Sequence, residues 1–159
     1  STAYLHNGPS AVRYPRGGGP GVSTTADLNT IEIGKGEVRR QGKKVAILAF
    51  GSMLTPALEA AERIDATLAN MRFVKPLDMD LVKTLADQHD LIVTIEENAI
   101  MGGAGAAVME ALQTMNIDKP ILCLGLPDTF IEHGIHETML AECGLDVGGI
   151  VAAIEKKLT

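Results

Sequence analysis

Two adjacent carboxylates, Glu96 and Glu97, stand between an apolar, β-branched run at 91–95 and glycines at 102, 103 and 105. Carboxylates where a strand ends can do acid–base chemistry. Nothing nearby singles out a nucleophile for them, so a solvated or interface loop is the favoured interpretation. The glycines fit a dinucleotide fingerprint poorly, because six residues separate the strand from the first glycine and Val108 replaces the third. Helix packing or a subunit contact explains them better.

A second group of reactive types is Glu132, His133, His136 and Glu137, whose H-x-x-H spacing could hold a metal. The pair brackets the start of a predicted helix, so capping and surface roles are favoured and we assign no metal ligand. Ser52 follows a strand without the G-x-S-x-G pattern of a nucleophile elbow, which makes it a helix cap. The sequence therefore assigns no catalytic residue.

The two cysteines, Cys123 and Cys143, lie far apart on apolar stretches. This arrangement favours free thiols in a reducing cytosol over a disulfide or a metal pair.

Arg13 and Arg16 flank Tyr14-Pro15 in a glycine-rich segment. An arginine presents a fork of donors that suits a phosphate, and the glycines after Arg16 would let a ligand approach closely. Surface ion pairs within a linker explain the same residues equally well. The spacing alone leaves both interpretations open.

Composition excludes several classes of partner. The 159 residues carry a net charge of −6 and only 3% aromatic residues, which argues against nucleic acid as a partner. No apolar run approaches the roughly 20 residues that a membrane span needs. We therefore expect no nucleic-acid and no membrane partner.

From residue 45 onward, short apolar strands alternate with amphipathic helices, which is typical of parallel pairing with right-handed crossovers. We expect strands at 45–50, 66–71, 91–95 and 121–124, with helices at 52–64, 78–86, 104–115, 136–142 and 146–158. Gln41-Gly42-Lys43 predicts a hairpin that pairs the mixed segment 32–40 with the strand at 45–50. The fold class is a three-layer α/β/α sandwich, with a mostly parallel five-stranded sheet and one antiparallel edge strand.

A short strand is also expected at 11–14, and the polar residues at 23–30 are predicted to form a linker. The small residues between Asn98 and Val108 predict a two-fold contact between subunits, because they allow close approach.

Four segments stand in the order of one known family: GPSAVRYPRG (8–17), MRFVKPLD (71–78), EENAIMGGAG (96–105), and GLPD with FIEHG (125–128 and 130–134). Together they resemble the C-terminal part of the bacterial 1-deoxy-D-xylulose-5-phosphate synthase family, within the transketolase-like thiamine diphosphate enzymes. One departure is Ala106-Ala107, where relatives often carry Ser-Gly.

This resemblance implies that residues 1–22 are the tail of an upstream pyrimidine-binding domain, 23–30 the linker, and 31–159 a transketolase C-terminal domain. It implies a cytoplasmic homodimer that uses thiamine diphosphate and Mg²⁺ to condense pyruvate with glyceraldehyde 3-phosphate, releasing CO₂. The cofactor ligands would lie upstream, so this chain alone should bind no cofactor and be inactive, serving dimer assembly and the active-site rim. Arg16 matches the family's phosphate-binding arginine.

Two alternatives remain at this point. One is the C-terminal β-chain domain of a 2-oxoacid dehydrogenase, and the other is a self-contained nucleotide-binding or interaction domain.

Overall fold

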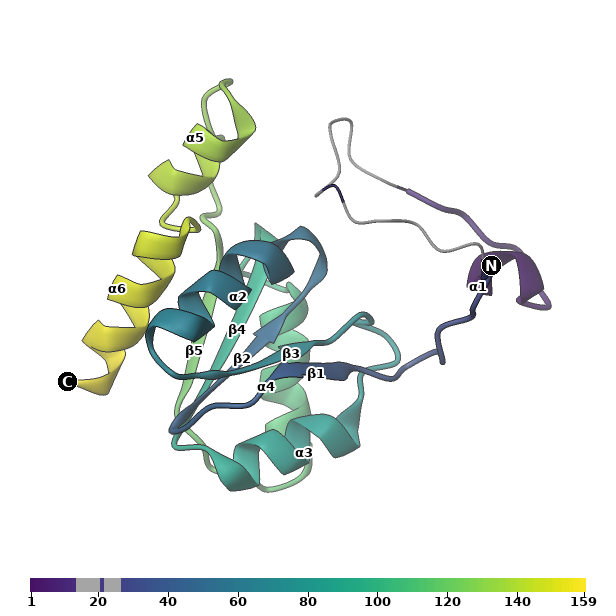
Figure 1. Cartoon of the computed structure of the whole chain (residues 1–159), viewed down its shortest axis with the longest axis horizontal. Helices are drawn as coiled ribbons and strands as arrows, with labels where there is room; N and C mark the ends of the chain where they lie inside the picture. Colours follow the sequence, from purple (N-terminus) through teal and green to yellow (C-terminus); the bar gives the residue numbers. More distant parts are fainter. Residues whose placement is uncertain (14–20, 22–26) are drawn as a thin grey trace. The chain divides into compact units, whose positions relative to one another are not determined.

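The chain contains a five-stranded mixed sheet, seen in a computed structural model that describes residues 1–13, 21 and 27–159. The chain divides into two compact units, residues 1–33 and 34–159. The second unit holds the sheet, whose order is β1 (Glu37–Arg40), β3 (Thr67–Asn70), β2 (Val45–Ala49), β4 (Leu91–Ala99) and β5 (Ile121–Leu126) (Figure 1). Only the pair β1–β3 is antiparallel. The predicted fold class is confirmed.

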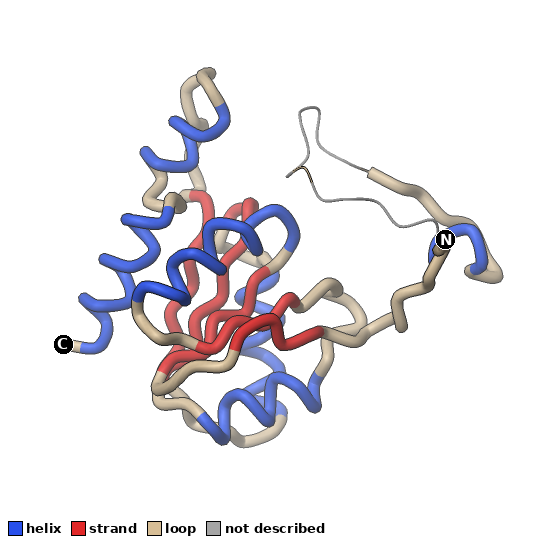
Figure 2. Tube along the Cα trace, viewed as in Figure 1, coloured by secondary structure: helices blue, strands red, loops and turns tan. Residues whose placement is uncertain are grey.

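Helices cover both faces of this sheet (Figure 2). Helices α2 (Leu54–Arg63) and α6 (Val147–Leu158) pack on one face, and α3 (Met79–Gln88) and α4 (Ala104–Thr114) on the other. Successive strand residues point to opposite faces, so Val45, Ile47 and Ala49 enter the first core and Ala46 and Leu48 the second. A strand buried on both faces must be apolar throughout, as β2 is.

Two helix starts follow the predicted capping chemistry. The Asp78 carboxylate accepts a hydrogen bond from the backbone N–H of Leu81 at 3.1 Å, and Asp146 accepts one from Gly149 at 2.8 Å. Ser52 is not a helix cap, which corrects the prediction. It lies in a 3-10 turn, η1 (Gly51–Met53), and its hydroxyl donates to Glu97.

The predicted hairpin at residues 41–43 is wrong, because β3 inserts between the two strands it was meant to join. The connection instead crosses the start of β3, where Gly42 donates to the Thr67 hydroxyl at 2.9 Å. A Cβ on Gly42 would meet the Ala66 carbonyl carbon at 2.3 Å, so the glycine serves close approach of two backbones.

The described part of the first unit contains one short helix, α1 (Thr2–Leu5). The Thr2 hydroxyl accepts a hydrogen bond from the Ile31 N–H at 2.8 Å, which closes this unit on itself. The strand predicted at 11–14 does not form at residues 11–13, whose side chains are exposed, and Tyr14 lies outside the described residues. Across the described residues, no helix combines the length and apolar character needed to cross a bilayer.

Candidate functional site

Strand β4 continues past Ile95 to Ala99, so Glu96 and Glu97 lie within it and not after it. The alternation of strand side chains then separates the two carboxylates. Glu96 faces the side covered by α4, and Glu97 faces the side covered by α2 and α6. The two neighbours therefore sit in different environments at the carboxyl end of the sheet, where open α/β sheets meet their ligands.

Glu96 caps helix α4. Its side chain is 5% exposed, and its two carboxylate oxygens accept hydrogen bonds from the N–H groups of Ala104 (2.7 Å) and Gly105 (2.8 Å). A carboxylate at a helix start satisfies unpaired donors and interacts favourably with the helix dipole. The prediction of a solvated or interface loop is wrong for this residue.

The glycines around Glu96 allow close packing at the start of α4 and the end of the sheet. A Cβ on Gly103 would lie 2.5 Å from a Glu96 oxygen, one on Gly105 would lie 2.6 Å from the Thr94 hydroxyl, and one on Gly125 would lie 2.8 Å from the Asn98 carbonyl. The N–H groups that a nucleotide phosphate would use at this helix start are already bound to Glu96. The sequence predicts helix packing or a subunit contact, and packing within the chain accounts for Gly103 and Gly105.

Glu97 joins three elements. One carboxylate oxygen accepts a hydrogen bond from Ser52 in η1, and the other accepts one from Nε2 of His136, 2.6 Å away at the start of α5 (His136–Glu142). Burial raises the pKa of Glu97, but the hydrogen bonds from Ser52 and His136 outweigh it and leave the pKa below its ordinary value. The same hydrogen bond and the charge of Glu97 raise the pKa of His136.

The cluster of Ser52, Glu97 and His136 is arranged to stabilise charge and not to activate a nucleophile. A nucleophilic serine needs its hydroxyl on a base that a third group orients. Here Ser52 and His136 both bond to the carboxylate, one to each oxygen. Among the described residues no three His, Cys, Asp or Glu side chains converge on a potential metal, and Cys123 and Cys143 are free thiols.

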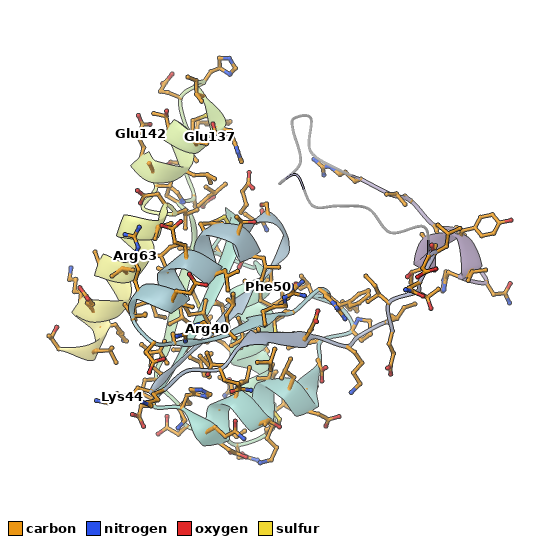
Figure 3. All side chains as sticks on the ribbon, viewed as in Figure 1. Arg40, Lys44, Phe50, Arg63, Glu137 and Glu142 are labelled. Carbon is orange, nitrogen blue, oxygen red and sulfur yellow. The ribbon has the colours of Figure 1, made fainter. Side chains whose placement is uncertain are left out.

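A groove of about 440 Å³ opens beside the cluster, between the end of β4 and the segment that follows β5. It is lined by Asn98, Ala99, Leu126, Pro127, Asp128, Thr129, Phe130 and Ile131. Large apolar side chains near the groove are exposed, among them Met101, Phe130 and Ile135. Figure 3 shows the side chains here, with Glu137 and Glu142 marking α5 and Phe50 marking the end of β2.

The small residues that suggested a subunit contact are used within the chain. Ala104, Gly105 and Val108 are buried in the packing of α4 on the sheet. The exposed part of the segment is its turn, at Met101 and Gly102. Bulky substitutions at Ala104 or Gly105 would therefore disturb the fold and could not report on association.

Arg16, the predicted substrate contact, lies outside the described residues, while Arg13 is described and exposed. Sequence reasoning missed the link between Glu97 and His136, which are 39 positions apart. Extending the two-residue alternation of the strand through position 97 would have placed Glu97 on the α2 side and exposed this link.

The family model for the C-terminal domain of transketolase matches residues 34–150. Among curated proteins, the 1-deoxy-D-xylulose-5-phosphate synthase of Methylobacillus flagellatus is 74% identical over 158 residues, which are 99% of this chain and 26% of that protein. The synthase of Nitrosomonas europaea is 58% identical over the same shares of both chains. This chain thus spans about a quarter of the length of these relatives.

Two solved structures share the fold. One, described as a split gene transketolase in an inactive β4 tetramer, has a TM-score of 0.75 and 34% identity, covering 80% of this chain and 43% of that one. Transketolase from Campylobacter jejuni has a TM-score of 0.55 and 18% identity, covering 77% of this chain and 18% of that one. At that identity the second likeness concerns the fold alone.

Proposed function

This chain belongs to the transketolase C-terminal domain family, and from this premise we propose that it acts as the C-terminal domain of a 1-deoxy-D-xylulose-5-phosphate synthase. The observation that carries the proposal is the 74% identity to one such synthase across 99% of the chain. The whole enzyme would be a bacterial, cytoplasmic, thiamine diphosphate-dependent transferase. It would condense pyruvate with glyceraldehyde 3-phosphate to 1-deoxy-D-xylulose 5-phosphate and CO₂.

Within that enzyme this domain supports the active site and takes no part in the bond changes. The described residues offer no convergent set of metal ligands, and the helix start best suited to a diphosphate is capped by Glu96. We propose that thiamine diphosphate, which supplies the carbanion chemistry when bound, and its Mg²⁺ are held by other parts of the enzyme. Arg16 is the proposed substrate contact, on the phosphate of glyceraldehyde 3-phosphate, and residues 1–22 the proposed tail of the upstream domain.

We also propose that the whole enzyme is a homodimer to which this domain contributes. The exposed apolar side chains at the carboxyl end of the sheet support a contact there. The β4 tetramer of the 34% identical transketolase chain supports self-association of this kind of domain, and its description as inactive supports the inactivity of this chain alone.

A chimera tests the proposed function. The Methylobacillus flagellatus synthase would carry these 159 residues in place of its own matching segment, and product formation from pyruvate and glyceraldehyde 3-phosphate would be measured. We expect activity close to that of the unaltered synthase, and neither activity nor saturable thiamine diphosphate binding for the isolated chain. A folded, cofactor-binding chimera without activity would overturn the proposal.

A further inference from the structure

The segment between β5 and α5 has few attachments to the rest of the domain. Eight of its nine residues, at 127–130 and 132–135, are exposed, and α5 contains no buried residue. Among the described residues, no hydrogen bond joins 127–134 to another part of the chain. Leu140 and Cys143, at the end of α5, are partly buried against the core. The polar contact between α5 and the sheet is the hydrogen bond between His136 and Glu97.

This link lies next to the groove at the carboxyl end of the sheet. Glu97 directly precedes Asn98 and Ala99, which form one wall of the groove, and residues 126–131 form the other wall. The second wall runs on through 132–135 to His136. The bond between His136 and Glu97 therefore connects the two walls at the end of the segment 127–135.

We propose that His136 and Glu97 form a pH-dependent latch that fixes the start of α5 and the segment 127–135 against the end of β4, and so sets the width of the groove. Ser52 donates to the other oxygen of the Glu97 carboxylate. The latch is a property of this domain and does not depend on the proposed function.

The charges around His136 fix the direction of the response. Glu97 on β4 and Glu137 on α5 are the titratable groups that act on it, and both raise its pKa above the ordinary value of 6.5. The latch is therefore fully formed below pH 6.5 and weakens as the pH rises through the raised pKa of His136. At the acid end, the lowered pKa of Glu97 keeps its carboxylate charged below its ordinary value of 4.5.

The strength of the latch is modest because both partners are in contact with water. The side chains of His136 and Glu97 are 55% and 31% exposed. Pairs of this kind shift a local equilibrium by about two- to fivefold. A change of this size is enough to shift the local unfolding equilibrium of α5, because few other contacts hold its first turn.

Hydrogen exchange of the 159-residue chain tests the latch. The amide of Met139 donates to the carbonyl of Ile135, and that of Cys143, the residue after α5, donates to Met139, so both report the opening of α5. After correction for intrinsic exchange, protection of α5 should fall about two- to fivefold between pH 6 and pH 8.5. His136→Gln, which keeps a donor without the charge, should abolish this dependence, whereas His133→Gln should behave as the unaltered chain.

An NMR titration of the His136 ring gives an independent reading. Its midpoint should lie above 6.5 and should fall toward 6.5 in Glu97→Gln. These exposed positions tolerate substitution, so loss of folding would not mask the result. Protection of α5 that stays constant with pH, or that falls equally in His136→Gln, would overturn the latch. An unshifted His136 midpoint in Glu97→Gln would overturn it as well.

Discussion

Glu96 and Glu97 differ in role although they are identical in type and adjacent in sequence. Strand alternation places one against the N-terminus of α4 and the other beside Ser52 and His136. A buried carboxylate that accepts two backbone hydrogen bonds stabilises the fold, whereas a partly exposed ion pair contributes little. Position along the strand therefore determines which glutamate stabilises the fold.

Substituting each glutamate separately tests this difference. In Glu96→Gln the amide nitrogen would face one of the two helix N–H donors, leaving that donor unpaired and the charge lost. We expect a loss of about 2–3 kcal/mol in the free energy of unfolding, measured by urea denaturation at pH 7. Glu97→Gln should cost under about 1 kcal/mol because its partners are in contact with water. Equal losses in the two variants would show that the capping contacts do not stabilise the domain.

At the scale of elements, α6 contains two adjacent glycines with opposite requirements. A Cβ added to Gly148 would have an Asp146 carboxylate oxygen as its nearest neighbour, at 3.7 Å. A Cβ added to Gly149 would lie 2.5 Å from the Gly144 carbonyl oxygen. Gly148 is free to become alanine, the better helix former, and Gly149 is fixed by the close turn before the helix.

We therefore expect Gly148→Ala to raise the free energy of unfolding by about 0.5–1 kcal/mol. Gly149→Ala should lower it by about 1–3 kcal/mol, because the Gly144 backbone must move to admit the methyl group. Thermal unfolding of the two variants beside the unaltered chain measures both effects. A Gly149→Ala chain as stable as Gly148→Ala would contradict the close packing at the start of α6.

Sequence periodicity predicted most of these elements because burial on one or two faces is a local pattern. The caps at Asp78 and Asp146 were also predictable, since each acts on an N–H three residues away. The cap on α4 was not, because Glu96 acts eight and nine residues away and across a strand end. The hairpin failed for a related reason: strand order depends on β3, which comes later in the chain than the supposed turn at 41–43.

At the scale of the whole molecule, the sheet is well covered, and the proposed function assigns the bond changes to other parts of the enzyme. The sheet has both faces covered, and residues 34–150 match one family model throughout. Yet the chain spans about a quarter of its relatives' length, and its own charged cluster activates no nucleophile. Under the proposed function, a contribution to substrate binding comes from Arg16, which matches the family's phosphate-binding arginine.

The last prediction concerns Arg16 in the chimeric synthase. A guanidinium–phosphate bond in a sheltered site contributes about 1.5–3 kcal/mol, so Arg16→Ala should raise KM for glyceraldehyde 3-phosphate by roughly ten- to a hundredfold. The phosphate is remote from the reacting carbons, so kcat falls too if its binding positions the aldehyde. KM for pyruvate and the affinity for thiamine diphosphate should change little. The control variant Arg13→Ala should leave kcat and both KM values unchanged. Steady-state kinetics with each substrate varied separates these effects. An unaltered KM and kcat for glyceraldehyde 3-phosphate would make Arg16 a linker residue, because removing a contact to the phosphate must weaken binding of the substrate that carries it.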